Sequence, residues 1–324
     1  MTMALAVRDL QVQVRGHDTR RVLVETVSLE VRAGTMLGIV GETGAGKTLT
    51  VRALVGLLPP GVAATGEMSV AGERGIALSE PDRLAPIRGT RVGIVLQNPI
   101  AMFDPMLRLR AQLIEGVVRR QLLDRKQALD RAHTLLHRLG FDEPDHVLDL
   151  FPHQLSGGMG QRLAIAMVLM PKPSVVIADE PTSALDANLR VDALRLLREI
   201  GAEEHTAIVL VSHDLGLVSN FCDELAVMYA GRIVEQGPAS EVLGDPQHPY
   251  ARALADCSPS LEVQPRQPLA SIPGSAPTPS EWPTGCTFAP RCPLVFKRCT
   301  EERPRLRPHG DRLAACHLAF GGDQ

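Results

Sequence analysis

The sequence predicts an α/β protein: a parallel-sheet core with an antiparallel β-subdomain, a helical subdomain and a small irregular C-terminal extension. Three observations support this prediction. Short apolar runs alternate with helix-like segments, which is typical of a parallel sheet. The first 33 residues alternate apolar and polar positions, as half-buried antiparallel strands do. After about residue 256 the composition shifts: seven prolines between Ser258 and Pro283 exclude a regular helix or strand there, and four cysteines cluster at the C-terminal end.

Length and composition limit the possible functions. A chain of 324 residues can form one large domain and a smaller one. The formal net charge of −3 gives no electrostatic reason to expect nucleic acid as a partner. No run approaches the roughly 18–20 apolar residues that cross a bilayer, and Met1–Gln13 has the pattern of a strand rather than of a signal peptide. We therefore expect a cytoplasmic chain that reaches a membrane only through a partner.

The N-terminal third is expected to contain three strands and a helix. Leu5–Val14 and Val22–Val31 alternate as antiparallel strands, and Met36–Val40 is apolar throughout, as a buried strand is. A glycine-rich turn follows. Leu49–Leu58 then predicts a helix that ends at two prolines and a glycine.

The middle of the chain predicts a helical subdomain over about residues 98–170. Within it Arg119–Leu139 has a broad leucine face and is expected to be one helix. Beyond it, Ser174–Ala178 and Ala207–Ser212 are short apolar strands that enclose a helix at Leu189–Ile200. This strand–helix–strand order favours a parallel sheet.

The turn after Met36–Val40 predicts a phosphate-binding loop. Its residues fit G-x-x-x-x-G-K-[ST] between a strand and a helix: Gly41, Glu42, Thr43, Gly44, Ala45, Gly46, Lys47 and Thr48. Glycines let the backbone wrap around phosphate oxygens, and a helix N-terminus favours negative charge. Lys47 should contact the β- and γ-phosphates, and Thr48 should ligate Mg²⁺. A chance glycine-rich turn is the alternative, which the flanking strand and helix disfavour.

Two acids follow the predicted strand Ser174–Ala178. Ligands of an open parallel sheet lie at the carboxyl ends of its strands. Asp179 is therefore expected to help hold Mg²⁺, and Glu180 to orient or activate an attacking water. Two solvated acids that cap a strand are the alternative, which a nearby phosphate loop makes weaker.

Further motifs resemble those of ABC ATPases. One segment resembles the ABC signature motif: Leu155, Ser156, Gly157, Gly158 and Met159. Gln97 matches the Q-loop glutamine, and His213, at a strand end, matches the switch histidine. A further segment resembles the D-loop of the family: Ser183, Ala184, Leu185 and Asp186. Taken alone, the signature could be a plain helix start and the histidine a solvated side chain, but these motifs occur in the family's order.

The resemblance spans about residues 3–256 and implies a fold and a mechanism. It implies a P-loop ABC ATPase cassette with a RecA-like core over residues 1–256, followed by an extension over 257–324. ATP and Mg²⁺ are the implied cofactors, with Gln97 joining Thr48 and Asp179 at the metal and His213 contacting the γ-phosphate. The signature motif would close over ATP held by a second ATPase subunit, which a paralogue commonly supplies.

Other segments resemble the ATPases of dipeptide, oligopeptide and nickel importers. Gln97-Asn98-Pro99, Met228–Gly237, His248-Pro249-Tyr250 and Cys286–Pro293 carry this resemblance. It implies two transmembrane permeases, an extracytoplasmic solute-binding protein and a place at the cytoplasmic face of the cell membrane. Peptides are the favoured solute, and nickel or another small solute stays open.

Other ABC-type functions fit less well. ATPases of DNA repair or ribosomes carry two cassettes or a long coiled-coil insertion, whereas only about 60 residues separate Gln97 from Leu155. Exporter cassettes are usually fused to membrane helices. A regulatory module with an inactive site is disfavoured because every catalytic position, including Glu180, is filled.

The C-terminal cysteines predict a metal centre. Cys286, Cys292, Cys299 and Cys316 have the spacing C-x5-C-x6-C-x16-C, which lacks the paired C-x2-C of many zinc sites. Four thiolates suit a [4Fe–4S] cluster, which would stabilise a segment too rich in proline for a large core. Zinc, with His309 or His317 as a further ligand, and free thiols or a disulfide stay open as alternatives.

Overall fold

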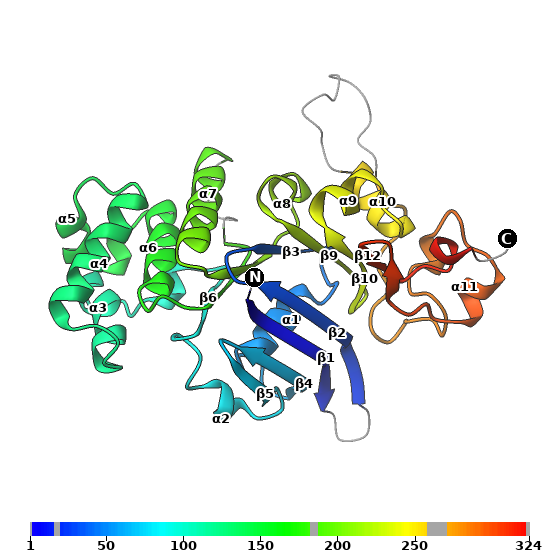
Figure 1. Ribbon diagram of the computed structural model, residues 1–324, viewed down its shortest axis with the longest axis horizontal. Coiled ribbons are helices and arrows are strands. Elements are labelled where there is room, and N and C mark those ends of the chain that lie inside the picture. The colour runs from blue at the N-terminus through cyan, green and yellow to red at the C-terminus, as the bar shows by residue number, and fades with distance from the viewer. Residues whose placement is uncertain (1, 16–19, 182–186, 258–270, 322–324) are drawn as a thin grey trace.

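The strands of the protein form two sheets in the computed structural model, which describes residues 2–15, 20–181, 187–257 and 271–321 (Figure 1). A group of helices lies at one end of the molecule and the C-terminal extension at the other. The smaller sheet lies beside the middle of the larger one. The residues predicted to bind nucleotide and catalyse hydrolysis follow strands in the middle of the larger sheet.

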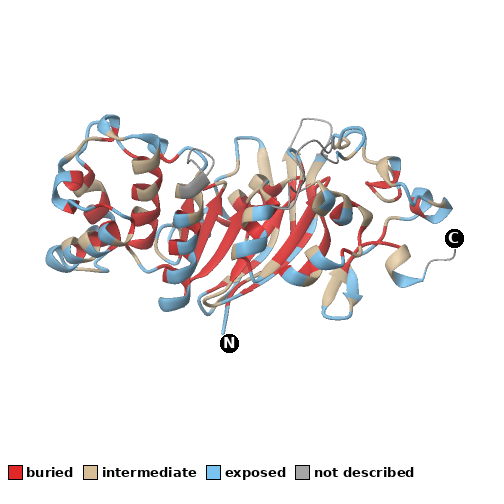
Figure 2. Ribbon diagram, turned by 90° about the horizontal axis from the view of Figure 1, so that it is seen from above, coloured by how far each residue is buried: buried red, intermediate tan, exposed pale blue. Residues whose placement is uncertain are grey.

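The larger sheet has eight strands and a parallel centre. Their order is β11 (Arg307–His309), β12 (Arg312–Ala314), β10 (Arg232–Pro238), β9 (Glu224–Tyr229), β3 (Met36–Val40), β8 (Ala207–Val211), β7 (Val175–Asp179) and β6 (Val92–Val95). Neighbouring strands from β9 to β6 pair in parallel. Every residue of β3, β6, β7 and β8 is buried, as Figure 2 shows in red. The predicted parallel core is confirmed.

The smaller sheet is antiparallel, as predicted. Its order is β2 (Arg20–Arg32), β1 (Met3–Arg15), β4 (Val62–Val70) and β5 (Glu73–Ala77). Along β2 the buried Val27, Leu29 and Val31 alternate with exposed Ser28 and Glu30, the period of a strand with one buried face. Its buried face packs with α1 (Lys47–Leu54), the helix that follows the phosphate loop.

The helical subdomain differs from the prediction at one boundary. It contains α3 (Leu109–Arg119), α4 (Arg125–Arg138), α5 (Pro144–Asp149) and α6 (Gly157–Leu169). The expectation of a single helix over Arg119–Leu139 is wrong, because α3 ends where that helix was to begin. Asp124 starts a new helix: its carboxylate accepts the Gln127 N–H at 2.8 Å, and the Gln127 side chain accepts the Asp124 N–H at 3.1 Å. Such a capping box fixes a helix start.

The remaining helices lie in several parts of the molecule (Figure 1). They are α2 (Pro81–Leu84), α7 (Ala187–Glu203), α8 (Leu215–Phe221), α9 (Ala239–Gly244), α10 (Pro249–Asp256), α11 (Lys297–Glu301) and four 3₁₀ turns (Ile100–Met102, Pro152–Gln154, Ala289–Arg291, Leu318–Phe320). The helix expected at Leu49–Leu58 is shorter, since α1 ends at Leu54, and the one expected at Leu189–Ile200 lies within α7. In the described ranges no helix is both long and apolar enough to cross a bilayer.

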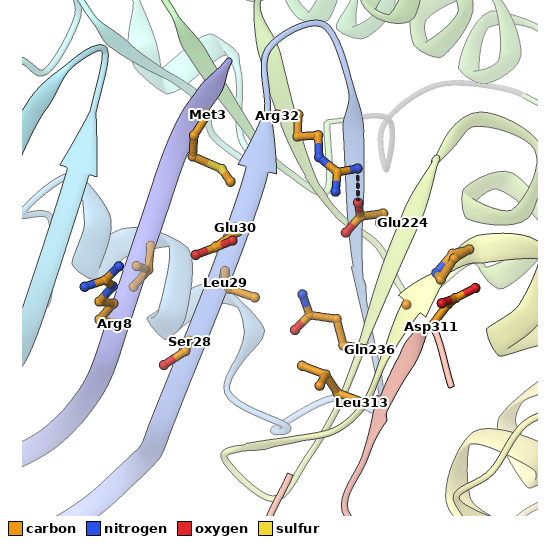
Figure 3. Close-up of a pocket in the computed structure, with 13 residues that line it drawn as sticks. Met3, Arg8, Ser28, Leu29, Glu30, Arg32, Glu224, Gln236, Asp311 and Leu313 are labelled. Atoms are coloured by element: carbon orange, nitrogen blue, oxygen red, sulfur yellow. Dashed lines mark hydrogen bonds and ion pairs between the residues drawn. The ribbon is translucent and has the colours of Figure 1, made fainter. Parts of the chain in front are cut away.

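The C-terminal extension continues the larger sheet. β12 pairs antiparallel with β10, matching Glu235 to Ala314 and Gln236 to Leu313. A cleft of about 770 Å³ lies between β2 and these strands, where Arg32 reaches Glu224 with a 3.5 Å ion pair (Figure 3). None of the phosphate-loop residues lines this cleft. The extension is therefore packed onto the cassette, and the cleft is separate from the predicted nucleotide site.

Candidate active site

The predicted phosphate loop, residues 41–48, joins β3 to α1 with the backbone geometry that its glycines allow. Gly41 has φ +153°, and a Cβ there would lie 2.1 Å from the Met228 carbonyl oxygen. Gly46, with φ +99°, is the N-cap of α1 and offers no side chain to cap it. Because the first N–H groups of a helix have no partner within it, this uncapped end can bind an anion.

Lys47 is buried and makes its contacts within the loop. Its ammonium group donates to the carbonyl oxygens of Gly41 at 2.7 Å and Glu42 at 3.0 Å. Burial lowers the pKa of Lys47, and the nearby carboxylates of Glu180, Asp179 and Glu42 oppose that shift. The loop thus holds one desolvated positive charge beside the free N–H groups of α1.

Asp179, at the end of β7, lies beside Thr48. The Thr48 hydroxyl donates to Asp179 Oδ1 at 3.0 Å. Asp179 is 1% exposed, and its other oxygen has no hydrogen-bond partner among the described residues. The nearest cation to that oxygen is Arg52, at 3.9 Å. Burial raises the pKa of Asp179. Mg²⁺ prefers oxygen ligands. The Asp179 oxygen that accepts no hydrogen bond from the described residues and the neighbouring Thr48 hydroxyl are ligands of this kind.

Three side chains from neighbouring strand ends meet beside this pair. Glu180 follows β7, Gln97 follows β6 and His213 follows β8. Gln97 Nε2 donates to Glu180 Oε2 at 3.0 Å, and His213 Nδ1 lies 3.2 Å from Glu180 Oε1. Glu180 has φ +49°, which turns the chain away from the strand. The predicted catalytic residues therefore form one cluster.

The other predicted motifs have different outcomes. Ser156 is the N-cap of α6, and its hydroxyl accepts the Met159 N–H at 3.3 Å. Ser156 and Gly157 are exposed at the start of a helix of the helical subdomain. The predicted D-loop, residues 183–186, lies outside the described residues.

Two residues near the loop had no place in the sequence-based site. The Tyr250 hydroxyl accepts the Glu42 N–H at 2.8 Å, and Arg291 pairs with the Glu42 carboxylate at 2.7 Å. Both lie in segments that resemble the importer family, but neither belongs to a nucleotide motif. Only the folded chain shows that the C-terminal segments reach the loop.

Similar proteins identify the family. Residues 24–183 match the family described as "ABC transporter", and residues 234–299 match "Oligopeptide/dipeptide transporter, C-terminal region". A "Probable peptide ABC transporter ATP-binding protein y4tR" of Sinorhizobium fredii is 38% identical over 94% of this chain and 91% of its own length. The "Dipeptide transport ATP-binding protein DppD" of Escherichia coli is 38% identical over 91% and 90%.

The chain belongs to the family of ABC transporter ATP-binding proteins.

Solved structures of ABC ATPases share the fold. The subunit cbiO1 of Clostridium perfringens, part of an ABC transporter complex, superposes with a TM-score of 0.63 at 26% identity, covering 76% of this chain and 92% of its own. The ATP-binding cassette MJ0796 in a post-hydrolysis state has the same TM-score at 23% identity, covering 72% and 98%. The fold is thus that of an ABC ATPase cassette, and the chain is an ATPase that binds ATP.

The C-terminal cysteines of this ABC ATPase line one small cavity. Cys286, Cys292, Cys299 and Cys316 surround a space of about 20 Å³ together with His317. Burial raises the pKa of Cys286 to about 11, and it also raises the pKa of Cys292 and Cys316. As they stand, no three or more His, Cys, Asp or Glu side chains of the described ranges are arranged to hold a metal ion. The comparisons give no support for an iron–sulfur or zinc centre.

Proposed function

We propose that this chain is the ATP-hydrolysing subunit of an importer that takes up peptides through partner permeases. The observation that carries the proposal is the meeting of Glu180, Gln97 and His213 beside Lys47 and Asp179. The names of the two relatives and of the C-terminal family support peptides over nickel or another small solute, because each refers to peptide, dipeptide or oligopeptide transport.

The residues divide the work of hydrolysis by position. Lys47 moves from its loop carbonyls to the β- and γ-phosphates, and the α1 N-terminus donates to the same oxygens. Thr48, Asp179 and Gln97 would hold Mg²⁺, which would neutralise charge on the phosphates. Glu180 orients the attacking water and takes up its proton, and His213 stabilises charge at the γ-phosphate.

The assembly around this site is proposed from the resemblance. Leu155–Met159 would close over the ATP of a second, paralogous ATPase subunit, and residues 183–186 would run along that interface. Two permeases and an extracytoplasmic solute-binding protein would complete the importer, with this chain on the cytoplasmic face of the membrane. We divide the chain into a cassette at 1–256, with its helical subdomain at about 98–170, and an extension at 257–324.

Reconstitution tests this function. The complete complex in vesicles should hydrolyse ATP faster when its binding protein carries a peptide than when the binding protein is empty. If Ni²⁺ speeds up ATP hydrolysis and peptide does not, nickel is the transported solute instead. No nucleotide hydrolysis by the complex under any of these conditions would contradict the proposal.

We also propose that the four C-terminal cysteines bind one metal centre. Their common cavity supports the proposal, although a volume of about 20 Å³ has room for little more than one water-sized ligand. A [4Fe–4S] cluster would need the thiols to move apart, whereas one Zn²⁺ would need less movement. Anaerobic purification followed by iron, sulfide and zinc analysis decides between them. Protein without any metal, with the extension still protected from protease, would reject both.

A further inference from the structure

Arg291 connects the C-terminal extension to the phosphate loop. It lies in the 3₁₀ turn Ala289–Arg291, and its side chain is 6% exposed. Nη1 donates to Glu42 Oε2 at 2.7 Å and Nη2 donates to Glu42 Oε1 at 3.0 Å. Two parallel bonds between a guanidinium and a carboxylate fix both groups in orientation as well as in distance.

The guanidinium is held on its other sides by the extension. Nε donates to the Pro273 carbonyl at 2.8 Å, and Nη2 donates to the Ile272 carbonyl at 3.2 Å. The Tyr229 hydroxyl lies 3.3 Å from Nη1, and the Phe288 ring centre lies 5.9 Å from the guanidinium carbon. Arg291 is therefore a rigid point of attachment.

Glu42 is held at each of its polar groups. Arg291 binds its carboxylate, Tyr250 accepts its N–H and Lys47 donates to its carbonyl. Tyr250 is itself fully buried, with its ring centre 4.5 Å from that of Tyr229. Glu42 is the second residue of the loop that is to wrap around phosphates, so these contacts set the direction of the loop's first peptide groups.

The pair also controls charge beside the nucleotide. Burial lowers the pKa of Lys47, and the Glu42 carboxylate is close enough to the ammonium group to oppose that shift. Paired with Arg291, this carboxylate is neutralised. Without Arg291, a partly desolvated negative charge would repel phosphate and attract the Lys47 ammonium away from it.

We propose that the C-terminal extension sets the affinity of the phosphate loop for nucleoside triphosphate through the Arg291–Glu42 pair. Arg291 is in this sense a positioning residue, which acts on the nucleotide through Glu42. The inference rests on the proposed nucleotide site and adds a long-range control of it by the extension.

The test compares four proteins: the unaltered chain, Arg291→Gln, Glu42→Gln and the double variant. MgATP affinity is measured by equilibrium titration in the absence of turnover. Arg291→Gln should weaken binding at least about tenfold, since it leaves Glu42 charged and unpaired. The double variant should bind MgATP at least about threefold more tightly than Arg291→Gln, because no unpaired carboxylate remains. Glu42→Gln completes the cycle and measures how much of the effect belongs to Glu42 alone.

The double variant distinguishes positioning from stability. It lacks Arg291 just as the single variant does, so any loss of folding in the extension is common to both. Equal weakening in Arg291→Gln and the double variant, or no weakening in either, would overturn the inference. Arg298→Gln, which removes an exposed pair with Glu302 in the same extension, is the matched control and should leave the affinity unchanged.

A separate measurement keeps the two proposals apart. If Lys47→Ala abolishes ATP binding while Arg291→Gln has no effect, the nucleotide site stands and the control by the extension fails. If the unaltered chain binds no nucleotide, the proposed function fails and this inference fails with it.

Discussion

At the scale of single residues, we propose that nucleotide affinity depends most on Lys47. In the structure its ammonium group is bound to two carbonyl oxygens of its own loop, so its charge is already desolvated. A phosphate that replaces those carbonyls forms a charge-assisted hydrogen bond without the further free-energy cost of desolvating the lysine. The burial of Lys47 thus prepares the loop for an anion.

Lys47→Ala should weaken MgATP binding by about 100-fold or more, because it removes a charge-assisted contact worth about 3 kcal/mol in a desolvated site. Equilibrium titration measures the loss. Lys126→Ala removes an exposed lysine at the start of α4 and should leave the affinity unchanged. Equal affinities for Lys47→Ala and the unaltered chain would contradict the assignment of the loop.

Glu180→Gln should separate binding from turnover. Glutamine keeps the shape and the contacts with Gln97 and His213 but cannot take a proton from water. We expect hydrolysis by the complete complex to fall at least about 100-fold while MgATP affinity changes by less than about threefold. Glu203→Gln, at an exposed ion pair with Arg138, serves as the control. Near-normal hydrolysis by Glu180→Gln would place the catalytic water elsewhere.

The sequence predicted these residues because each belongs to a short local motif. A glycine-rich loop, a pair of acids and a histidine at strand ends are all visible in the chain. Arg291 could not be predicted as part of the site. Its role depends on a contact across 249 residues, and no local pattern records such a distance.

At the scale of elements, strands were easier to predict than helix ends. β3 has the predicted bounds because a buried parallel strand is apolar throughout. The break between α3 and α4 was missed because leucines continue across it, although Leu122 is 44% exposed and does not face the core. The capping box at Asp124 was the signal that could have located the break.

His248 gives the short helix α10 a pH-dependent cap. Its Nδ1 accepts the Tyr250 N–H at 3.0 Å, and burial lowers the pKa of His248 to about 3. The unfolded chain binds this proton near pH 6.5, so it holds more protons than the folded chain between those values. The free energy of unfolding should therefore fall as the pH drops from 6.5 to 3, by up to about 1.4 kcal/mol per unit.

His248→Asn should make this dependence shallower, because asparagine can cap the helix but does not titrate here. Denaturant unfolding across the acid range measures the slope. Glu235 accepts the backbone N–H of residue 248, and burial raises its pKa, but that carboxylate titrates in both proteins. His205→Asn, at an exposed site, should keep the original slope. Equal slopes for all three proteins would contradict the role of His248.

At the scale of the whole molecule, the predicted signature motif and the predicted catalytic residues differ in their surroundings. Glu180 contacts Gln97 and His213 of its own chain, whereas Ser156 and Gly157 are exposed at the start of α6. An exposed helix N-terminus with small residues suits the phosphates of a second subunit. The sequence predicted this division only through its resemblance to a family, since composition and periodicity carry no information on assembly.

Ser156→Arg should therefore stop hydrolysis by the assembled complex without affecting ATP binding by this chain. A large cation at the helix start blocks close approach of the partner's nucleotide, and we expect a loss of about 100-fold in rate. Thr134→Arg places the same side chain on an exposed part of α4 and should be close to neutral. A complex with Ser156→Arg that hydrolyses ATP normally would exclude α6 from the interface.

The long separation between Glu42 and Arg291 has a consequence for biosynthesis. The ribosome completes the phosphate loop first and adds its C-terminal partner 249 residues later. At roughly 5–20 residues per second, that interval lasts about 12–50 s. During it the nascent cassette can fold the parallel centre of its larger sheet, because β3, β6, β7, β8 and β9 all precede Arg291, but it carries an unpaired acidic group in its loop. Full affinity for ATP would then arrive only after Arg291 has been added, so chains that stop before this residue would compete poorly for the nucleotide.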